Sequence, residues 1–105
     1  MSFATPYQDS ASTAPSITTT SSTILRDRSG GLKRSQLVIT NTSAATRITI
    51  SKGDVVAVDG QGITLAAGAS YYESTDGGYT CWQGAVQAVG NGNGTLAVVE
   101  SFELR

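Results

Sequence analysis

The sequence predicts an all-β protein, either a small antiparallel β-sandwich or a jelly-roll-like barrel, with an extended N-terminal arm. Three observations support this fold class. The 105-residue chain is rich in Thr, Ser and Gly, which favour strands and turns over helices. Short apolar–polar alternations recur about every 8–12 residues between Gly-, Asn- and Asp-containing turns. No long stretch has a helical period. From the number of alternating segments we expect one domain of about seven or eight strands.

The first residues differ in composition from the rest of the chain. Ser, Thr, Ala and Pro dominate them, and the first basic residue is Arg26. Because such a segment buries too little apolar surface to fold alone, we expect residues 1–16 to form an extended arm. Residues 17–105 would then form the single sandwich domain. Phe3 and Tyr7 are candidate anchors of the arm on a neighbouring chain, and the alternative is that the arm runs back over its own domain.

Strand-like segments follow one another along the domain, each bounded by turn residues. The first is rich in Thr and suits a polar edge strand. Leu37 and Ile39 alternate with polar residues, as do Ile48 and Ile50, so each pair belongs on the buried face of a strand. The expected segments are 17–25, 36–40, 47–51, 55–58, 63–65, 69–73, 82–88 and 96–104.

The last third of the chain is the most apolar. Trp82 shares its parity with Val86, so we expect Trp82 in the core. Residues 90–94 read Gly-Asn-Gly-Asn-Gly, which predicts a hairpin because Asn and Gly accept the positive φ of tight turns. Glu100 interrupts the apolar parity of the last strand. Either a β-bulge shifts the register at Glu100 or its side chain faces a partner, and we favour the bulge.

The sequence offers few groups for catalysis or for metal binding. It contains no histidine, and its single cysteine, Cys81, is expected to be a buried, inert thiol. Asp54, Asp59 and Asp76 lie in predicted turns, where an Asp side chain bonds to nearby backbone N–H groups. The sequence has neither a calcium-loop motif nor a phosphate-binding loop. We therefore expect no enzyme activity, no cofactor and no metal site.

Charge and hydropathy argue against two further classes of protein. The formal net charge is −1 and only 14% of residues are charged, unlike a basic nucleic-acid-binding domain. No apolar run approaches the ~18 residues that span a membrane.

One basic cluster could meet phosphates, an acidic protein surface or only solvent. Because no aromatic residue is interleaved for base stacking, we favour a protein partner over nucleic acid. The cluster consists of Arg26, Arg28, Lys33 and Arg34.

Strand and turn motifs follow a recognisable order over residues 32–103. They are LKRSQLVITN (32–41), GITLAAG (62–68), the aromatic strand SYYE (70–73), WQGAVQAV (82–89), and a Gly-rich turn before a closing strand. This order resembles small virion proteins of tailed bacteriophages. The resemblance implies a β-sandwich decoration or cement protein that binds the major capsid protein at the capsid surface. It further implies a homo-oligomer, with a trimer favoured, in a virion made in the cytoplasm of a bacterial host.

The leading functional hypothesis is a non-enzymatic protein that stabilises a phage head by bridging neighbouring major capsid subunits. One alternative is a host-surface carbohydrate-binding module, in which Trp82 or the pair Tyr71 and Tyr72 forms an exposed platform. Another is a head–tail or tail component. At least one of Tyr71, Tyr72 and Tyr79 is expected to be exposed near the Gly-rich turn. The predicted partner contacts are Phe3, Tyr7, Arg26, Arg28, Lys33 and Arg34.

Overall fold

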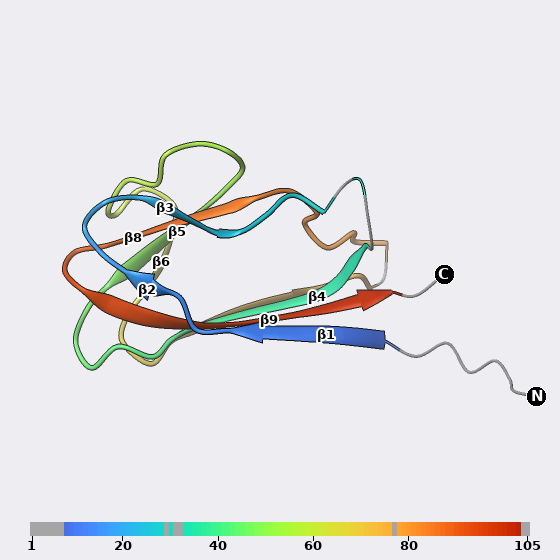
Figure 1. The fold of residues 1–105 in the computed structure, drawn as a ribbon, viewed down its shortest axis with the longest axis horizontal. Coiled ribbons are helices and arrows are strands. Elements are labelled where there is room, and N and C mark those ends of the chain that lie inside the picture. Colours follow the sequence, from blue (N-terminus) through green and yellow to red (C-terminus); the bar gives the residue numbers. More distant parts are fainter. Residues whose placement is uncertain (1–7, 29, 31–32, 77, 104–105) are drawn as a thin grey trace, which may run out of the picture.

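The structure, a computed structural model, describes residues 8–28, 30, 33–76 and 78–103. Its strands form two antiparallel sheets that lie over one another as the layers of a β-sandwich (Figure 1). One sheet has the order β1-β9-β4-β7, with β2 also paired to β9, and the other has the order β3-β8-β5-β6. The predicted all-β sandwich is therefore confirmed.

Nine strands occur in the described residues, connected by turns and short loops. They are β1 (Gln8–Thr13), β2 (Ser16–Ile17), β3 (Ser22–Leu25), β4 (Arg34–Asn41), β5 (Ile48–Lys52), β6 (Ile63–Leu65), β7 (Ser70–Ser74), β8 (Val86–Gly90) and β9 (Gly94–Glu103).

The first two strands continue one another along β9. β1 pairs Thr13 with Val98, and β2 pairs Ser16 with Thr95, so the register is the same in both. The break falls at Pro15, which has no N–H group to donate to the ladder. β1 and β2 are therefore one interrupted strand. The predicted strand 17–25 is divided between β2 and β3, which lie in different sheets.

β1 changes the predicted division into an arm and a domain. The sequence predicts a separate arm over residues 1–16, but residues 8–13 are a strand in the sheet of their own chain. For these residues the alternative, a segment that runs back over its own domain, describes the structure. Ile17 is the first residue whose described side chain is buried, so burial begins later than strand pairing. Phe3 and Tyr7 lie outside the described residues.

The core lies between the two sheets and is built from alternating residues of facing strands. Leu37 and Ile39 of β4 belong to one buried cluster with Ile48 and Ile50 of β5, as their alternation predicts. Burying such a side chain contributes roughly 1.5–3 kcal/mol. The other buried members are Ile17, Leu25, Leu65, Cys81, Val86, Ala88, Leu96 and Val98.

The Gly-rich segment 90–94 does not close a hairpin. It connects β8 of one sheet to β9 of the other, so the two strands do not pair with each other. The N–H of Gly90 instead donates to the carbonyl of Thr18 at 2.8 Å. The glycines permit a tight crossing, since a Cβ on Gly94 would lie 2.4 Å from the Ser43 hydroxyl oxygen. The composition of the segment predicts the turn correctly, but it carries no information about which sheets the turn joins.

We expect Ile48→Ala to lower the free energy of unfolding by about 2–5 kcal/mol, because it leaves a cavity between the sheets. Urea denaturation would measure the change. The matched control is Val56→Ala, whose side chain is 69% exposed, and it should change stability by no more than about 0.5 kcal/mol. Equal losses from both variants would contradict the placement of the core.

Candidate interaction surface

Arg34, one of the predicted partner contacts, is buried inside its own chain with a side chain that is 0% exposed. Its Nε donates to Glu100 Oε2 at 2.8 Å. The other guanidinium nitrogens donate to three backbone carbonyls, those of Trp82, Gly84 and Arg26. A buried charge requires this kind of paired, hydrogen-bonded environment. Arg34 is therefore unavailable to a partner, and the prediction for this residue is wrong.

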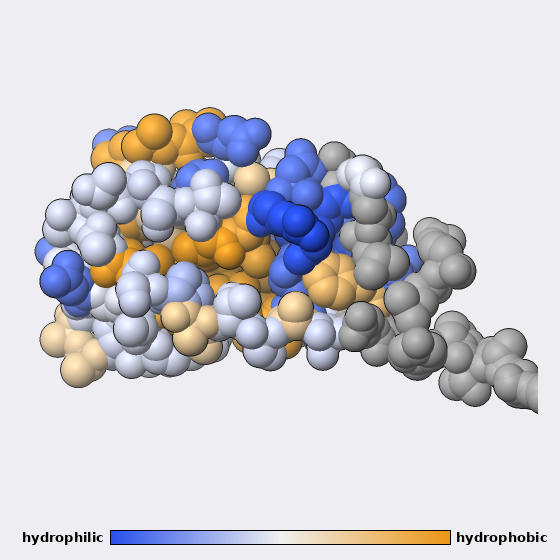
Figure 2. Space-filling model, in the orientation of Figure 1, coloured by the Kyte–Doolittle hydropathy of each residue, from blue (hydrophilic) through white to orange (hydrophobic). Residues whose placement is uncertain are grey.

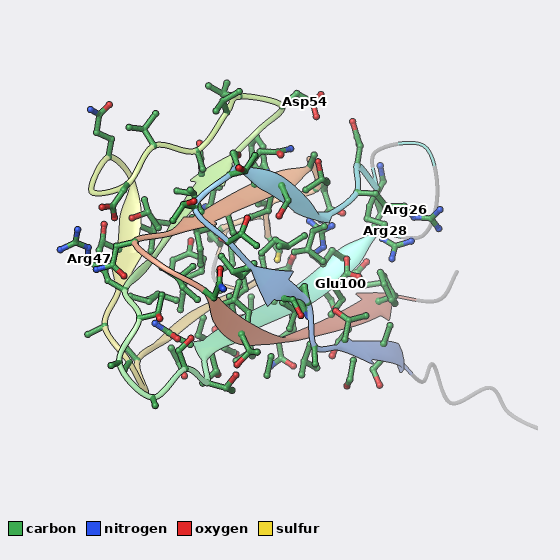
Figure 3. All side chains as sticks on the ribbon, turned by 60° about the vertical axis from the view of Figure 1, so that its left-hand side comes forward. Arg26, Arg28, Arg47, Asp54 and Glu100 are labelled. Atoms are coloured by element: carbon green, nitrogen blue, oxygen red, sulfur yellow. The ribbon has the colours of Figure 1, made fainter. Side chains whose placement is uncertain are left out.

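Arg28 is also engaged within the chain, although it is partly exposed. Its two donors lie 3.0 and 3.3 Å from the two carboxylate oxygens of Glu100, and its guanidinium carbon lies 4.7 Å from the centre of the Phe102 ring. Arg26 and Lys33 have exposed side chains. Figure 3 shows Arg26 and Arg28 together at one end of the sandwich. Among the four predicted basic contacts, Arg26 and Lys33 thus remain candidates for contact with a partner.

Glu100 faces the interior of the sandwich. The register shift on this side of the sheet lies in β4, between Arg34 and Gln36, and β9 runs through Glu100 without one. Burial raises the pKa of Glu100, but the hydrogen bonds from Arg28 and Arg34 outweigh burial and hold the pKa below its ordinary value. Glu100 neither marks a bulge nor faces a partner, so both sequence alternatives are wrong. It interrupts the apolar series because two arginines require a buried anion.

A second buried carboxylate, Glu73 of β7, is surrounded by donors. Lys52 Nζ lies 2.8 Å from Oε2, and the hydroxyl groups of Tyr71 and Tyr79 donate at 2.5 and 2.9 Å. The N–H of Trp82 donates at 2.6 Å. Burial raises the pKa of Glu73, but these donors outweigh it and lower the pKa to about 2. A carboxylate so stabilised as an anion is a poor general base, and it serves here to tie β7 to β5 across the sandwich.

The loop of residues 79–85 connects the two carboxylate clusters. The Gln83 side chain accepts from the N–H of Arg34 and donates to the Arg34 carbonyl, both at 2.6 Å. Trp82 packs against the core, as predicted, although it precedes β8 and is not part of it. Cys81 is buried, as predicted, and burial raises the pKa of its thiol to about 11. Such a thiol is a weak nucleophile at neutral pH.

A hollow of about 340 Å³ opens beside this loop, and it is lined by Lys33, Arg34, Thr75, Thr80, Gln83 and Glu103. Arg34 and Gln83 line it, and the polar atoms of both already have partners within the chain. Throughout the described residues, every buried side-chain nitrogen and oxygen has a hydrogen-bond partner. The same residues contain no cluster of three His, Cys, Asp or Glu side chains able to hold a metal ion. They also contain no helix long and apolar enough to cross a membrane.

Three exposed valines lie on the loop of residues 53–62 between β5 and β6, which we call the valine loop. Val55, Val56 and Val58 are 65%, 69% and 47% exposed. Figure 1 shows the loop standing above the sheet that contains β3, and Figure 2 shows an apolar patch on the same upper side of the molecule. The sequence predicts a strand over 55–58, but Val58 forms only an isolated bridge to Gln61. A short apolar run without alternation does not distinguish a buried strand from an exposed loop.

The valine loop is fastened to the body at its ends and in its middle. The N–H of Gly53 donates to a carbonyl just before β8 at 2.7 Å, and the N–H of buried Ala57 donates to the Ser21 hydroxyl at 2.9 Å. Arg47 holds both carboxylate oxygens of Asp59, the shorter contact being 2.7 Å, and this pairing lowers the pKa of Asp59. The valines are therefore displayed by an anchored loop.

The comparisons with known proteins establish the fold and nothing finer. No protein-family description and no curated protein sequence matches the chain. A solved structure from work on Bacillus endospore appendages, which form disulfide-linked pili, matches with a TM-score of 0.55 and 17% identity over 96% of this chain and 90% of that chain. The coat protein of Tobacco streak virus matches with a TM-score of 0.46 and 10% identity over 92% and 86%. The second likeness is too low to support an argument.

Glu73 makes the stability of the fold sensitive to acid. Its pKa is about 2 in the folded chain against an ordinary 4.5, so the stabilisation is complete above pH 4.5 and is lost as the pH falls towards 2. We expect Glu73→Gln to lower the free energy of unfolding at pH 7 by about 3 kcal/mol and by far less at pH 2. Urea denaturation across this pH range would measure both values.

The control for this experiment is Asp54→Asn, a carboxylate on the exposed valine loop, which should reproduce the wild-type curve (Figure 3). A Glu73→Gln protein that loses as much stability at pH 2 as at pH 7 would contradict the assignment of Glu73 as an ionised anchor.

Proposed function

We propose that this chain is a non-enzymatic structural protein of a tailed-phage virion, acting as a decoration or cement protein that bridges major capsid subunits. Two lines of support come from the sequence and the fold. The order of motifs over residues 32–103 resembles such proteins, and the chain folds as the small β-sandwich that the resemblance implies. The observation that carries the proposal is the anchored valine loop with its three exposed valines.

The valine loop has the properties of a protein contact. Contiguous exposed apolar side chains mark interaction sites, because water is released when a partner covers them. The loop is already ordered by Ala57 and by the Arg47–Asp59 pair, so little conformational entropy is lost when it binds. Arg26 and Lys33 are exposed and would add charged contacts. We assign the valine loop to the contact with the major capsid protein.

The placement of the reactive groups supports a structural role. The Glu73 and Glu100 carboxylates are held as anions by internal donors, and the Cys81 thiol is buried. The spore-appendage protein of similar fold forms disulfide-linked pili. In the present chain the single cysteine is buried, so we infer that its assembly depends on non-covalent contacts. The proposed location is the capsid surface, where the chain would act as a homo-oligomer.

We expect the triple variant Val55→Ser/Val56→Ser/Val58→Ser to bind capsids at least about ten-fold more weakly, because the apolar contact area is lost. Co-sedimentation with particles stripped of this protein would measure binding. Heating the loaded particles would test cementing, since particles carrying the wild-type protein should release their contents at a higher temperature.

The matched control is Tyr72→Ser, which removes an exposed apolar side chain from β7 of the other sheet. It should bind like the wild type. The proposal fails if the wild-type protein gives particles no added thermal stability, or if the valine variant binds as tightly as the control.

One observation favours the alternative that the chain is a carbohydrate-binding module. Tyr72 and Tyr79 are 56% and 48% exposed, whereas Tyr71 and Trp82 pack against the core. The exposed pair Tyr72 and Tyr79 is therefore a better candidate to stack on a sugar ring than Trp82, or than Tyr71 with Tyr72. Binding to a glycan array that is abolished by Tyr72→Ser would favour this alternative. A ring of copies at one vertex of the particle would instead identify a head–tail component.

A further inference from the structure

The valine loop covers part of the outer face of β5. Ile48 and Ile50 belong to the core, so Thr49 between them lies on the outer face of the sheet. Thr49 is nevertheless 0% exposed. A Cβ on Gly62 would lie 3.3 Å from Thr49 Cγ2 and 2.7 Å from the Ile50 carbonyl oxygen. The backbone at the end of the valine loop therefore rests directly on β5.

The hydroxyl group of Thr49 holds two consecutive residues of the valine loop. Its Oγ1 accepts a hydrogen bond from the N–H of Gly60 at 3.0 Å. The Asp59 carboxylate is also bound: the hydrogen bond from Arg47, with a smaller contribution from that of Thr49, lowers the pKa of Asp59 below its ordinary value. Arg47 and Asp59 are both exposed, so Thr49 is the buried member of this network.

Hydrogen bonds to the body of the protein determine which side of the loop faces solvent. The N–H of Ala57 donates to the Ser21 hydroxyl at 2.9 Å, and Ala57 is buried although Val56 and Val58 on either side of it are exposed. The hydrophobic effect alone would favour the opposite arrangement, with the valines inward. Because buried backbone N–H groups require acceptors, polar groups beneath the loop keep its backbone inward and its larger side chains outward.

We propose that Thr49 is a positioning residue of the valine loop, whose buried hydroxyl group keeps residues 59 and 60 on the sheet and so keeps the three valines turned towards a partner. This role rests on the proposed function, in which the valine loop contacts the capsid. It adds a residue that does not touch the capsid and still sets the affinity, because a loop ordered before binding loses less conformational entropy.

Hydrogen exchange of the purified full-length protein tests whether Thr49 holds the loop. We expect Thr49→Val, which removes the hydroxyl group at nearly constant size, to make the amides of residues 54–59 exchange about ten-fold faster. The amides of β4 and β9 should keep their wild-type rates. Thr49→Ser retains the hydroxyl group and should retain the slow exchange. Wild-type exchange of the loop in Thr49→Val would overturn the proposal.

The matched control is Thr40→Val, the same substitution on the other sheet, where the Thr40 hydroxyl lies 2.8 Å from that of Ser70. It should leave the exchange of the valine loop unchanged. Urea denaturation would verify that each variant is folded.

A second pair of variants applies if Thr49→Val does not fold. Arg47→Ala removes the ion pair alone, whereas Asp59→Ala removes the ion pair together with the bond from Thr49. Exchange of the loop should be faster in Asp59→Ala than in Arg47→Ala. Equal rates in the two variants would overturn the role of Thr49.

Co-sedimentation with stripped particles tests the consequence for binding. We expect Thr49→Val to bind capsids about three- to ten-fold more weakly, because the loop must be ordered on binding. Thr49→Ser and Thr40→Val should bind like the wild type. Wild-type affinity in Thr49→Val, in the presence of a loss in the triple valine variant, would overturn the proposal. If the wild-type protein itself does not bind capsids, the capsid proposal fails, whereas hydrogen exchange still decides whether Thr49 holds the loop.

Discussion

The buried guanidinium of Arg34 is the group on which one end of the sandwich depends. It connects β4 to Glu100 of β9, to the loop of residues 79–85 and to the backbone at Arg26. A buried arginine is tolerated only when an anion balances its charge and acceptors bind its N–H groups. β4, β9, the loop of residues 79–85 and the backbone at Arg26 therefore have to come together around the guanidinium. Arg28 completes the charge balance from the outer side and packs on Phe102.

The pairing of charged side chains inside the chain limits the charged groups that the surface can present to a partner. Few residues of the chain are charged, and the carboxylates Glu73 and Glu100 are both neutralised inside it by Lys52 and by the two arginines. Many of the remaining exposed side chains are Ser and Thr. The exposed large apolar side chains of the described residues are the three valines of the valine loop together with Tyr72 and Tyr79. A protein built in this way offers contact area. This is the physical basis of the proposed role in assembly.

The parts of the fold that depend on local pattern could be predicted, and the parts that depend on distant partners could not. The strands around Ile39 and Ile48 can be predicted from the sequence, because apolar–polar alternation is a local property that indicates which face of a strand is buried. The turn at residues 90–94 can also be predicted, because its Gly and Asn content is a local property. Its glycines are equally suited to a hairpin and to a crossing between sheets. From the sequence, Val55 and Val56 resemble core residues. An apolar run in a sequence does not indicate whether another element of the fold covers it.

The sequence by itself determined the all-β class, most of the core strands, the burial of Cys81, the packing of Trp82 against the core, and the presence of a basic cluster. Only the tertiary structure decided that Arg34 and Glu100 belong to each other, that the valine loop is exposed and that residues 8–13 form a strand in the sheet of their own chain. The reason is distance along the chain. Composition and periodicity describe neighbours in sequence, whereas an ion pair between residues 34 and 100 exists only after β4 and β9 have paired in one sheet.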